Sequence, residues 1–248
     1  MTFNPCIIIP VYNHETVLPE TIESIQQYKL PILLVDDGSS LECKKVLVEL
    51  SKKAHVFLTC NDSNLGKGGA VKTGLKAAQA QGFSHGLQID ADGQHNPKDI
   101  PRFVDYAKKN PTALIAGHPK YDASVPKGRL YARYLTHVWV WINCLSKKVI
   151  DSMCGFRVYP LQQSIELIDS CYTGNRMDFD PEFIVRWYWQ QLPLVQLQTA
   201  VIYPHHGISH FRAWEDNKLI SLMHTRLFFG MLLRSPKLIW RNVSGINK

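Results

Sequence analysis

The chain has 248 residues, of which 45% are hydrophobic and 20% charged, a balance that suits the core of one large domain and excludes a disordered chain. Six scattered cysteines form no CxxC pair and no Cys/His zinc spacing, which excludes a zinc module and favours a reduced, cytoplasmic setting. The N-terminus lacks a signal-peptide pattern, and the longest apolar run near the C-terminus falls well short of the roughly 20 residues that cross a bilayer.

The net charge of +7 is concentrated in the second half of the chain. Residues 1–117 contain 12 Lys and Arg against 12 Asp and Glu, whereas residues 118–248 contain 16 against 9. A basic half favours an anionic partner, such as a phosphorylated acceptor or a membrane surface, although a solvated basic face explains the charge equally well. No nucleic-acid-binding motif is present, so no nucleic-acid partner is expected.

The first 117 residues alternate between strand and helix patterns. Short apolar runs rich in β-branched residues predict strands, and apolar residues at helical spacing predict helices. The expected strands are 6–11, 31–37, 55–60, 85–90 and 112–118, and the expected helices are 14–28, 41–53, 66–82 and 97–109. This alternation predicts a mostly parallel, doubly wound α/β sheet, in which ligands bind beyond the carboxyl ends of the strands.

The pattern changes after residue 117. We expect helices over 128–149, 161–171, 180–192 and 214–233, and strands over 154–160 and 194–204. No repeat, low-complexity tract or linker separates the halves, so the second half is expected to complete the same sheet. The terminal stretch 227–240 combines apolar bulk with basic residues, which suits a membrane-interface segment. Packing onto the sheet or against a second subunit explains it equally well.

The stretch LQIDADGQHNP, residues 87–97, places three oxygen-bearing side chains at alternate positions after an apolar run. If the strand continues, Asp90, Asp92 and Gln94 share one face. An all-oxygen ligand set suits Mg²⁺ or Mn²⁺ and not zinc. Such a pair of aspartates alone is more often a turn, but its position beside three other polar loops favours a metal or substrate site. His95 is expected to be an ordinary loop residue, because hard cations prefer oxygen.

The glycine-rich segment NLGKGGAVKTG, residues 64–74, does not have the spacing of a P-loop, so an ATPase is not expected. The helix that follows could offer free N–H groups to a phosphate, with Lys67 as a point charge. Alternatively, Gly68 and Gly69 only allow close packing of the helix. Ser39 and Ser40 are expected to form a turn or to cap the N-terminus of the helix over 41–53.

Four motifs, PVYNHE, LLVDDGSS, NLGKGGAVKTGL and IDADGQHNPKDI, resemble in order and spacing the nucleotide-sugar-binding half of family 2 glycosyltransferases, which have the GT-A fold. DSMCGFRVYP and DFDPEFIVR resemble the polyprenyl-phosphate branch of that family, typified by dolichol-phosphate mannose synthase. The resemblance implies a single-domain GT-A enzyme. Its glycosyltransferase domain would be residues 1–215, with a donor half at 1–117 and an acceptor half at 118–215, followed by a helical segment at 216–248.

The resemblance also implies roles for individual residues. Asp92 and Gln94 would bind Mg²⁺ or Mn²⁺, and Asp90 would face the ribose or the sugar. The donor site as a whole would consist of Pro10, Tyr12, Asn13, Glu15, Asp37, Lys67, Asp90, Ala91 and Arg212. The catalytic acids would be Asp92, Asp180 and Glu182. Either of the last two could accept a proton from a hydroxyl acceptor, whereas a phosphate acceptor is already ionised and needs no base. Glu182 could instead be only a first-turn acid of a helix.

For the acceptor, the resemblance points to Arg129, Arg133 and Arg157, because the planar guanidinium suits phosphate recognition. A solvated basic stripe is the alternative. The segment GISHFRAWED resembles a family segment that closes over the diphosphate, which is why Arg212 is included, although His210 stands where a Lys or Arg is more usual.

Taken together, these features predict an inverting glycosyltransferase that moves a sugar from a UDP- or GDP-sugar to a polyprenyl phosphate or other lipid-linked acceptor. It would act in the cytoplasm, with a peripheral contact at the inner face of the membrane left open. A family 2 enzyme with a soluble saccharide or small hydroxylated acceptor, and a non-catalytic nucleotide-sugar-binding module, are the alternatives.

Overall fold

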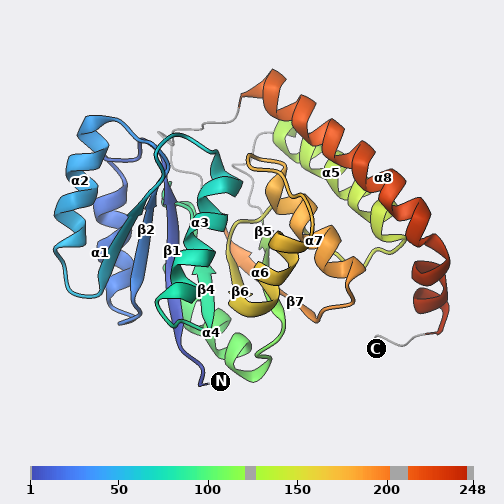
Figure 1. Ribbon diagram of the computed structural model, residues 1–248, viewed down its shortest axis with the longest axis horizontal. Coiled ribbons are helices and arrows are strands. Elements are labelled where there is room, and N and C mark those ends of the chain that lie inside the picture. Colours follow the sequence, from blue (N-terminus) through green and yellow to red (C-terminus); the bar gives the residue numbers. More distant parts are fainter. Residues whose placement is uncertain (1, 121–126, 202–211, 245–248) are drawn as a thin grey trace.

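In a computed structural model, residues 2–120, 127–201 and 212–244 are described, and within them seven strands form one sheet with helices on both faces (Figure 1). The strands are β1 (Pro5–Val11), β2 (Ile32–Asp36), β3 (Val56–Cys60), β4 (His85–Gln88), β5 (Leu114–Lys120), β6 (Arg157–Pro160) and β7 (Leu194–Ala200). The helices are α1 (Leu18–Gln26), α2 (Leu41–Ser51), α3 (Lys67–Ala80), α4 (Ile100–Lys109), α5 (Lys127–Cys144), α6 (Leu161–Ser170), α7 (Phe179–Trp189) and α8 (Ala213–Ser244), and a 3-10 turn, η1 (Pro97–Asp99), precedes α4.

The strand order is β3-β2-β1-β4-β6-β5-β7. Strands β1 to β4 pair in parallel, as do β5 and β7, and β6 runs antiparallel to both of its neighbours, β4 and β5. The predicted mostly parallel α/β sheet is therefore confirmed, and the second half of the chain completes the sheet of the first. The division between domains at residue 215 stays a prediction, and α8 begins at Ala213.

The alternation of side chains along the strands builds two hydrophobic cores, one on each face of the sheet. In β1, Ile7 and Ile9 face the core under α1, α2 and α4, whereas Cys6 and Ile8 face the core under α3, α6 and α7. Because helices cover both faces, β1 and β2 are apolar along almost their whole length and are buried throughout, as parallel strands in such sheets usually are.

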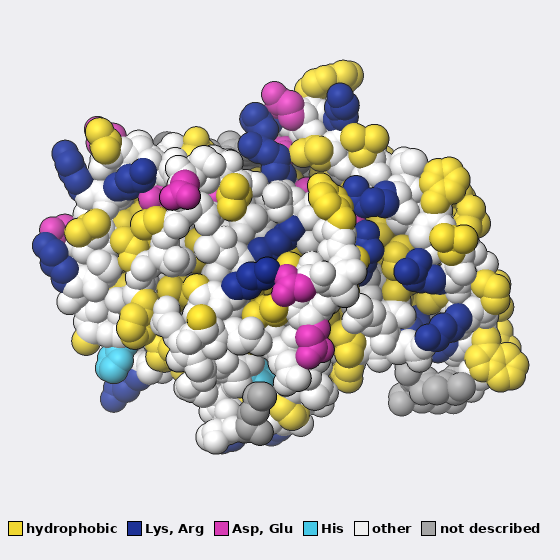
Figure 2. Space-filling view, viewed as in Figure 1, with side chains coloured by type: hydrophobic (Ala, Val, Ile, Leu, Met, Phe, Trp, Pro, Cys, Tyr) yellow, Lys and Arg dark blue, Asp and Glu magenta, His cyan; other side chains and the backbone are white. Residues whose placement is uncertain are grey.

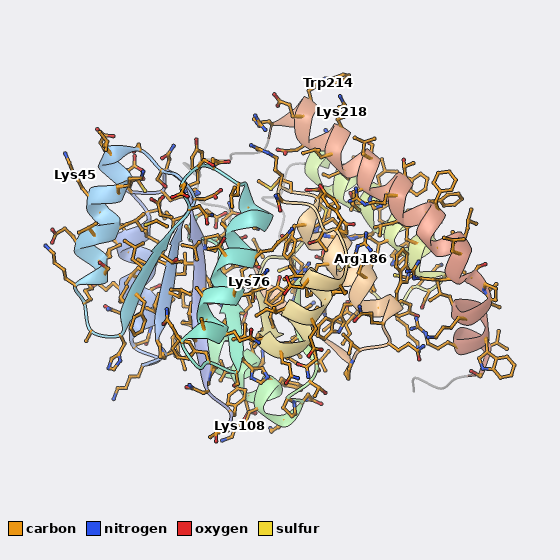
Figure 3. All side chains as sticks on the ribbon, in the orientation of Figure 1. Lys45, Lys76, Lys108, Arg186, Trp214 and Lys218 are labelled. Atoms are coloured by element: carbon orange, nitrogen blue, oxygen red, sulfur yellow. The ribbon has the colours of Figure 1, made fainter. Side chains whose placement is uncertain are left out.

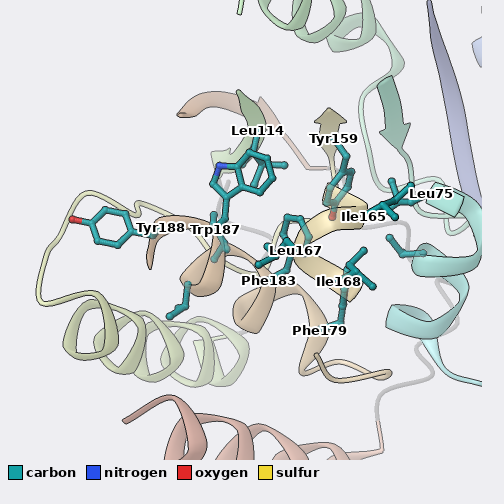
Figure 4. Packing of buried hydrophobic residues seen from close by; sticks show 14 of the residues in the cluster. Leu75, Leu114, Tyr159, Ile165, Leu167, Ile168, Phe179, Phe183, Trp187 and Tyr188 are labelled. Atoms are coloured by element: carbon teal, nitrogen blue, oxygen red, sulfur yellow. The ribbon is translucent and has the colours of Figure 1, made fainter. Parts of the chain in front are cut away.

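Helix α7 crosses the second core and is buried on nearly every side. Phe179, Phe183 and Trp187 follow one another at four-residue spacing, with ring centroids 5.5 Å and 5.7 Å apart, and Tyr159 of β6 packs edge-on against Phe183 (Figure 4). The first turn of α3 approaches this helix so closely that a Cβ on Gly68 would lie 2.3 Å from Cβ of Phe179. This geometry supports the packing interpretation of Gly68.

Helices α5 and α8 pack side by side outside α7 and form the outer edge of the molecule (Figure 1). Between them, Trp139 stacks on the buried His224, whose burial lowers its pKa to about 4. The predicted end of the last helix, at residue 233, is wrong, because α8 continues through Pro236. Pro236 has no N–H to donate to the carbonyl of Leu232, four residues earlier. The hydroxyl of Ser235 donates a 2.8 Å hydrogen bond to that carbonyl instead.

The part of α5 nearest the sheet is held by a buried carboxylate. Asp151 accepts three charged hydrogen bonds from Arg133, at 2.6 Å, 2.7 Å and 2.8 Å, and lies 3.2 Å from Nε2 of His137. Its Oδ1 also accepts from the backbone N–H groups of Met153 and Cys154. Burial disfavours the charged form, but the hydrogen bond from His137 and the charge of Arg133 outweigh it and hold the pKa of Asp151 well below its usual range.

Replacing Gly68 with Ala should lower the free energy of unfolding by about 1–3 kcal/mol, because the new methyl group overlaps the side chain of Phe179. Urea unfolding followed by circular dichroism measures this. Gly128→Ala is the matched control, since a Cβ there meets nothing within 4 Å and alanine favours a helix. Equal stability of the two variants would show that α3 does not pack on α7 in this way.

Asp151→Asn should destabilise the protein by about 3 kcal/mol at neutral pH, because Arg133 is left without its buried counter-charge. The pKa of Asp151 is depressed in the folded state, so its stabilisation is present above the unfolded pKa of about 4 and is lost as the pH falls below it. The difference in unfolding free energy between wild type and variant should therefore shrink in acid.

The measurement is urea unfolding at a series of pH values between neutrality and strong acid. Asp105→Asn serves as control, since Asp105 pairs with the exposed Lys109 at the surface and should produce little change at any pH. A difference for Asp151→Asn that stays constant across the series would refute the assignment.

Candidate active site

Three polar loops follow the carboxyl ends of β1, β2 and β4 and lie side by side, as parallel strands require. The backbone N–H of Asp37 donates to the carbonyl of Val11 at 2.9 Å, and that of Ile89 donates to Ile8 at 3.0 Å. The predicted donor-binding loops are thus joined by main-chain hydrogen bonds at one edge of the sheet.

The end of β1 and the loop after it carry four predicted donor residues. Pro10 is a buried residue of β1, and Tyr12 is half-buried. Asn13 adopts a left-handed conformation with φ 54°, and its side-chain oxygen accepts 2.8 Å from the backbone N–H of Ser40, which caps α2 as predicted. Oε2 of Glu15 is buried and accepts no hydrogen bond from the described residues. A donor group of a bound ligand would satisfy it.

Asp37, predicted to bind the nucleotide, is bonded on both carboxylate oxygens within the protein. Oδ1 accepts from the side chain of Asn61 at 2.8 Å and the backbone N–H of Leu65 at 2.9 Å, and Oδ2 accepts from the N–H of Gly66 at 2.8 Å. Burial raises its pKa even though these bonds favour the charged form. Asp37 therefore orders the loop before α3, and its contact with a nucleotide stays a prediction.

The centre of the site is a cation between two carboxylates. Lys67, the first residue of α3, places its ammonium 2.8 Å from Oδ2 of Asp90 and 3.5 Å from Oδ2 of Asp180. Burial disfavours the charge of Lys67, but the two aspartates outweigh it and raise its pKa. The same contact works in reverse on Asp90, whose pKa falls well below its usual range despite burial. Lys67 and Asp90 are therefore both charged at neutral pH.

Two further side chains hold Asp90 in place. Nε2 of Gln88 donates to Oδ1 of Asp90 at 3.1 Å, and the hydroxyl of Tyr159 donates to the Gln88 amide oxygen at 3.0 Å. Nε2 of His95 lies 3.3 Å from Oδ2 of Asp90, and the His95 ring packs on Phe156. His95, expected to be an ordinary loop residue, is instead almost buried against the site.

Gly155 and Arg157, just before and at the start of β6, pack against the two aspartates of the site. A Cβ on Gly155 would lie 2.6 Å from Oδ2 of Asp90, so any side chain there would displace the carboxylate. Arg157 is 1% exposed and donates to the carbonyls of Ser152, Cys154 and Asp180. Its guanidinium faces the protein interior, so the geometry assigns it to positioning Asp180, and its predicted contact with the acceptor stays a prediction.

The candidate metal ligands lie in a turn and not on an extended strand. β4 ends at Gln88, and the chain turns at the buried Ala91 and at Gly93, whose φ is +70°. The expected alternation of residues 90, 92 and 94 on one strand face is therefore wrong. Oδ1 of Asp92 accepts a 3.0 Å hydrogen bond from the backbone N–H of Gln94, which draws the two predicted metal ligands together.

This donor set fits a hard divalent cation bound together with a diphosphate. Within the described residues, no three His, Cys, Asp or Glu side chains form a cluster that could hold a metal by themselves. Mg²⁺ and Mn²⁺ at nucleotide sites need only one or two protein oxygens, since phosphate and water supply the rest. The half-buried Asp92 keeps its second carboxylate oxygen for such a contact, and the Gln94 amide oxygen is close in sequence.

The two candidate acids of α7 face different parts of the molecule. Asp180 points at Lys67 and Arg157, with Oδ1 3.6 Å from the guanidinium of Arg157. Glu182 is 0% exposed, and both its oxygens are bonded to Arg186 and Arg226. Its position agrees with the alternative that Glu182 is a first-turn acid of the helix, and its contact with Arg226 joins α7 to α8.

The remaining predicted residues are Arg129, Arg133, Arg212 and the segment around His210. Arg133 binds Asp151, as described above, and the side chain of Arg129 lies outside the described residues. Arg212 is exposed at the start of α8, with Nε 3.6 Å from Glu215. His210 and most of the segment predicted to close over the diphosphate also lie outside the described residues.

A cavity of about 390 Å³ opens beside Asp92, between α1 and the loop that leads to η1. Its apolar wall includes Ile89 and Phe156, and Asp92 and His95 border it on the side of the site. Thr21 of α1 contributes a hydroxyl to the opposite wall. The turn that contains the candidate metal ligand Asp92 therefore borders this cavity as well as the edge of the sheet.

Four residues of this site were missed by inspection of the sequence: Gln88, His95, Gly155 and Tyr159. Gln88 carried the only available signal, since a polar residue inside an otherwise apolar strand is normally hydrogen-bonded when buried. The contributions of Gly155 and Tyr159 depend on the pairing of β6 with β4, which local patterns do not reveal.

Comparison with known proteins agrees with this geometry. The model of Glycosyl transferase family 2 matches residues 6–164. The chain is 24% identical over 225 residues to the UDP-N-acetylglucosamine–dolichyl-phosphate N-acetylglucosaminyltransferase of Methanococcus voltae, covering 82% of this chain and 87% of the relative. It is 24% identical over 214 residues to the dolichyl-phosphate beta-glucosyltransferase of Dictyostelium discoideum, covering 77% and 64%.

Among solved structures, glucosyl-3-phosphoglycerate synthase from Mycobacterium tuberculosis, in complex with Mn²⁺ and UDP-glucose, superposes with a TM-score of 0.68 at 14% identity, covering 93% of this chain and 79% of that one. At this identity the likeness concerns the fold alone. The family model covers more than half of the chain and the strand order is that of one continuous sheet. The chain therefore belongs to glycosyl transferase family 2 and is a single-domain glycosyltransferase with the GT-A fold.

Proposed function

We propose that this glycosyltransferase moves a sugar from a UDP- or GDP-sugar to the phosphate of a polyprenyl phosphate, with inversion and with Mg²⁺ or Mn²⁺. The observation that carries the proposal is Lys67, held between Asp90 and Asp180 at the edge of the sheet where the donor loops meet. The two dolichyl-phosphate transferases described above support the acceptor class, and the UDP-glucose and Mn²⁺ of the structural neighbour support the donor and the metal.

The leaving group of such a reaction is a nucleoside diphosphate, on which negative charge builds up. Bound at Asp92 and Gln94, the metal would offset part of this charge as a Lewis acid. Lys67 supplies a fixed positive charge from the protein, at the N-terminus of α3. The backbone N–H of Gly69 already donates to the carbonyl of Asn175 at 2.8 Å, so it is not available to the diphosphate. We therefore assign the stabilisation of the diphosphate at this helix end to the ammonium of Lys67. Arg212, at the start of α8, would add a second charge.

Asp180 is the acid we assign to the reaction. Its carboxylate lies near the ammonium of Lys67, whereas Glu182 is sealed between two arginines. With a phosphate acceptor the nucleophile is already ionised, so Asp180 would orient Lys67 and the sugar and would not act as a base. With a hydroxyl acceptor the same carboxylate would accept the proton.

We place the acceptor on the side of α5 and the loop of residues 151–155. Arg133 brings a guanidinium to this side of the site, and Asp151 orients it. Arg129, one helical turn earlier, belongs to the proposed acceptor site by sequence. The reaction would take place in the cytoplasm, which agrees with six free cysteines, four of them buried.

Binding of the donor is tested by thermal unfolding with UDP- and GDP-sugars, each with and without Mn²⁺. At about 100 times its dissociation constant a ligand stabilises the fold by about 2.7 kcal/mol, which corresponds here to a rise in Tm of about 5–10 °C. Asp92→Asn should abolish the part of the rise that depends on Mn²⁺. Asp62→Asn, an exposed acid on the loop after β3, is the control. No rise with any nucleotide diphosphate would refute the donor assignment.

The two acids of α7 should behave in opposite ways. Asp180→Asn should keep the fold but slow sugar transfer by about 100-fold or more, because Lys67 loses one of its two carboxylate partners. Glu182→Gln should destabilise the fold by about 3 kcal/mol, because two arginines lose a buried counter-charge. Asp169→Asn, an exposed acid paired with Lys76, controls for both.

Transfer of labelled sugar to a polyprenyl phosphate and to a free polyprenol measures the activity, and urea unfolding measures the stability. Full transfer by Asp180→Asn would remove Asp180 from the mechanism. Transfer only to the alcohol, or only to soluble saccharides, would overturn the acceptor class and leave the donor site intact.

A further inference from the structure

A second, smaller cavity lies far from the strand ends, between the end of α7 and the C-terminal half of α8. Its volume is about 130 Å³, and its lining residues are Trp189, Gln191, Arg234, Lys237, Leu238 and Arg241. Sites for whole small-molecule ligands usually measure roughly 300–1,000 Å³, so this cavity is of a size for a single chemical group. Three of its six lining residues are cationic and none is acidic.

Arg241 is the buried member of this cluster, with an exposed fraction of 5%. Its Nη1 donates to the carbonyl of Tyr188 at 2.8 Å, and its guanidinium lies 3.9 Å from the centre of the Tyr188 ring. Nε and Nη2 are buried and donate to none of the described residues. Buried donors on a charged group are normally bonded, so these two atoms call for an acceptor from outside the described protein.

The other two cations are at the mouth of the cavity. Arg234 lies over the ring of Trp189 at 4.8 Å and donates to the carbonyl of Gly230, and Lys237 is exposed one turn further on. Their charge is not offset by the sequence around them. Residues 217–248 contain six Lys and Arg and no Asp or Glu. The ligand of this cavity should therefore be an anion, and the planar guanidinium of Arg241 suits phosphate oxygens.

The outer face of α8 beside the cavity is apolar. Leu222, Phe229, Leu233 and Trp240 are separated by seven, four and seven residues, so they share one face of the helix, and they are 54%, 61%, 84% and 70% exposed. Figure 2 shows hydrophobic side chains gathered along this edge of the molecule, with Lys and Arg side chains among them. Large apolar side chains exposed in a row usually mark an interaction surface.

We propose that this face of α8 docks onto the surface of an anionic phospholipid bilayer, with the phosphate of one headgroup in the cavity of Arg234, Lys237 and Arg241. The apolar stripe enters the interface between headgroups and acyl chains, and Trp240 lies at the headgroup level, where tryptophan is favoured. Within the described residues, no helix is both long and apolar enough to cross a bilayer, so the contact lies along the surface.

Charge favours a bilayer over a second copy of the chain. A two-fold dimer through this face would set the stripe and its cations against the same cations of the partner, because such interfaces are self-complementary. An anionic bilayer offers the opposite charge to each cation and an apolar layer to the stripe. The inference concerns binding alone and does not depend on the sugar-transfer reaction proposed above.

The test is co-sedimentation of the full chain with vesicles of phosphatidylcholine alone and of phosphatidylcholine with phosphatidylglycerol. We expect binding to the anionic vesicles that weakens with salt. Arg234→Gln combined with Lys237→Gln should weaken it about 30-fold, since each charge near an anionic surface contributes about a fivefold factor. Lys44→Gln combined with Lys45→Gln removes the same charge from α2, at the opposite end of the molecule (Figure 3), and should change binding little.

A second pair of substitutions tests the apolar stripe. Leu233→Ser combined with Trp240→Ser should also reduce binding to the anionic vesicles, while thermal unfolding stays unchanged because both side chains are exposed. Light scattering of the unmodified chain checks for dimers. The proposal would be overturned if the chain failed to bind anionic vesicles, or if the α2 and α8 charge variants lost vesicle binding equally. It would also be overturned if the chain formed a dimer that the Leu233→Ser, Trp240→Ser variant dissociates. Loss of nucleotide binding or of sugar transfer would leave it standing.

Discussion

The candidate active-site edge of this glycosyltransferase depends on one half-buried ammonium. Lys67 comes from the first turn of α3, Asp90 from the loop after β4 and Asp180 from the first turn of α7, so a single cation joins the first half of the chain to the second. Two carboxylates this close would repel each other without it. The neighbouring packing serves the same contact, because Gly68 lets α3 approach α7 and Gly155 leaves room for the Asp90 carboxylate.

Helix α7 connects the Lys67 cluster to the surface helix α8. Asp180 and Glu182 are two residues apart, so they point to different sides of the helix, one toward Lys67 and the other toward Arg226 of α8. Glu182 therefore links the position of α8 to the position of Asp180 through one rigid helical turn. Arg226 also lies 4.5 Å over the ring of Tyr172, next to the loop whose Asn175 carbonyl accepts from Gly69. The surface helix α8 and the candidate active site therefore share one set of contacts.

Features with a local cause could be predicted from the sequence. Apolar periodicity predicted the strands and most helices, and the short side chain of Ser40 predicted the cap of α2. The polar residues at the strand ends predicted where the site would lie, because strand direction alone brings those ends together. The resemblance carried by the motifs was confirmed at the level of family and fold.

Features that depend on distant partners could not be predicted. Arg157 and Arg133 look like free cations in the sequence, but the fold places carbonyls and Asp151 around them. The turn at Gly93 breaks the strand that the Asp-x-Asp spacing suggested. His95 becomes part of the site only because Phe156 supports its ring. The contacts of the two arginines and of His95 come from residues far away in the chain. The turn depends on a single backbone angle, that of Gly93.

The antiparallel strand β6 has a consequence for how the protein is made. β4 pairs with β1 on one side and with β6 on the other, and β6 is the strand that joins it to β5. While the ribosome has released only the first 120 residues, β4 presents an open edge to the cell and Lys67 has only one of its two carboxylates. A chain that ends before β6 would therefore leave the β4 edge unpaired, and an unpaired strand edge is a site for pairing with other chains.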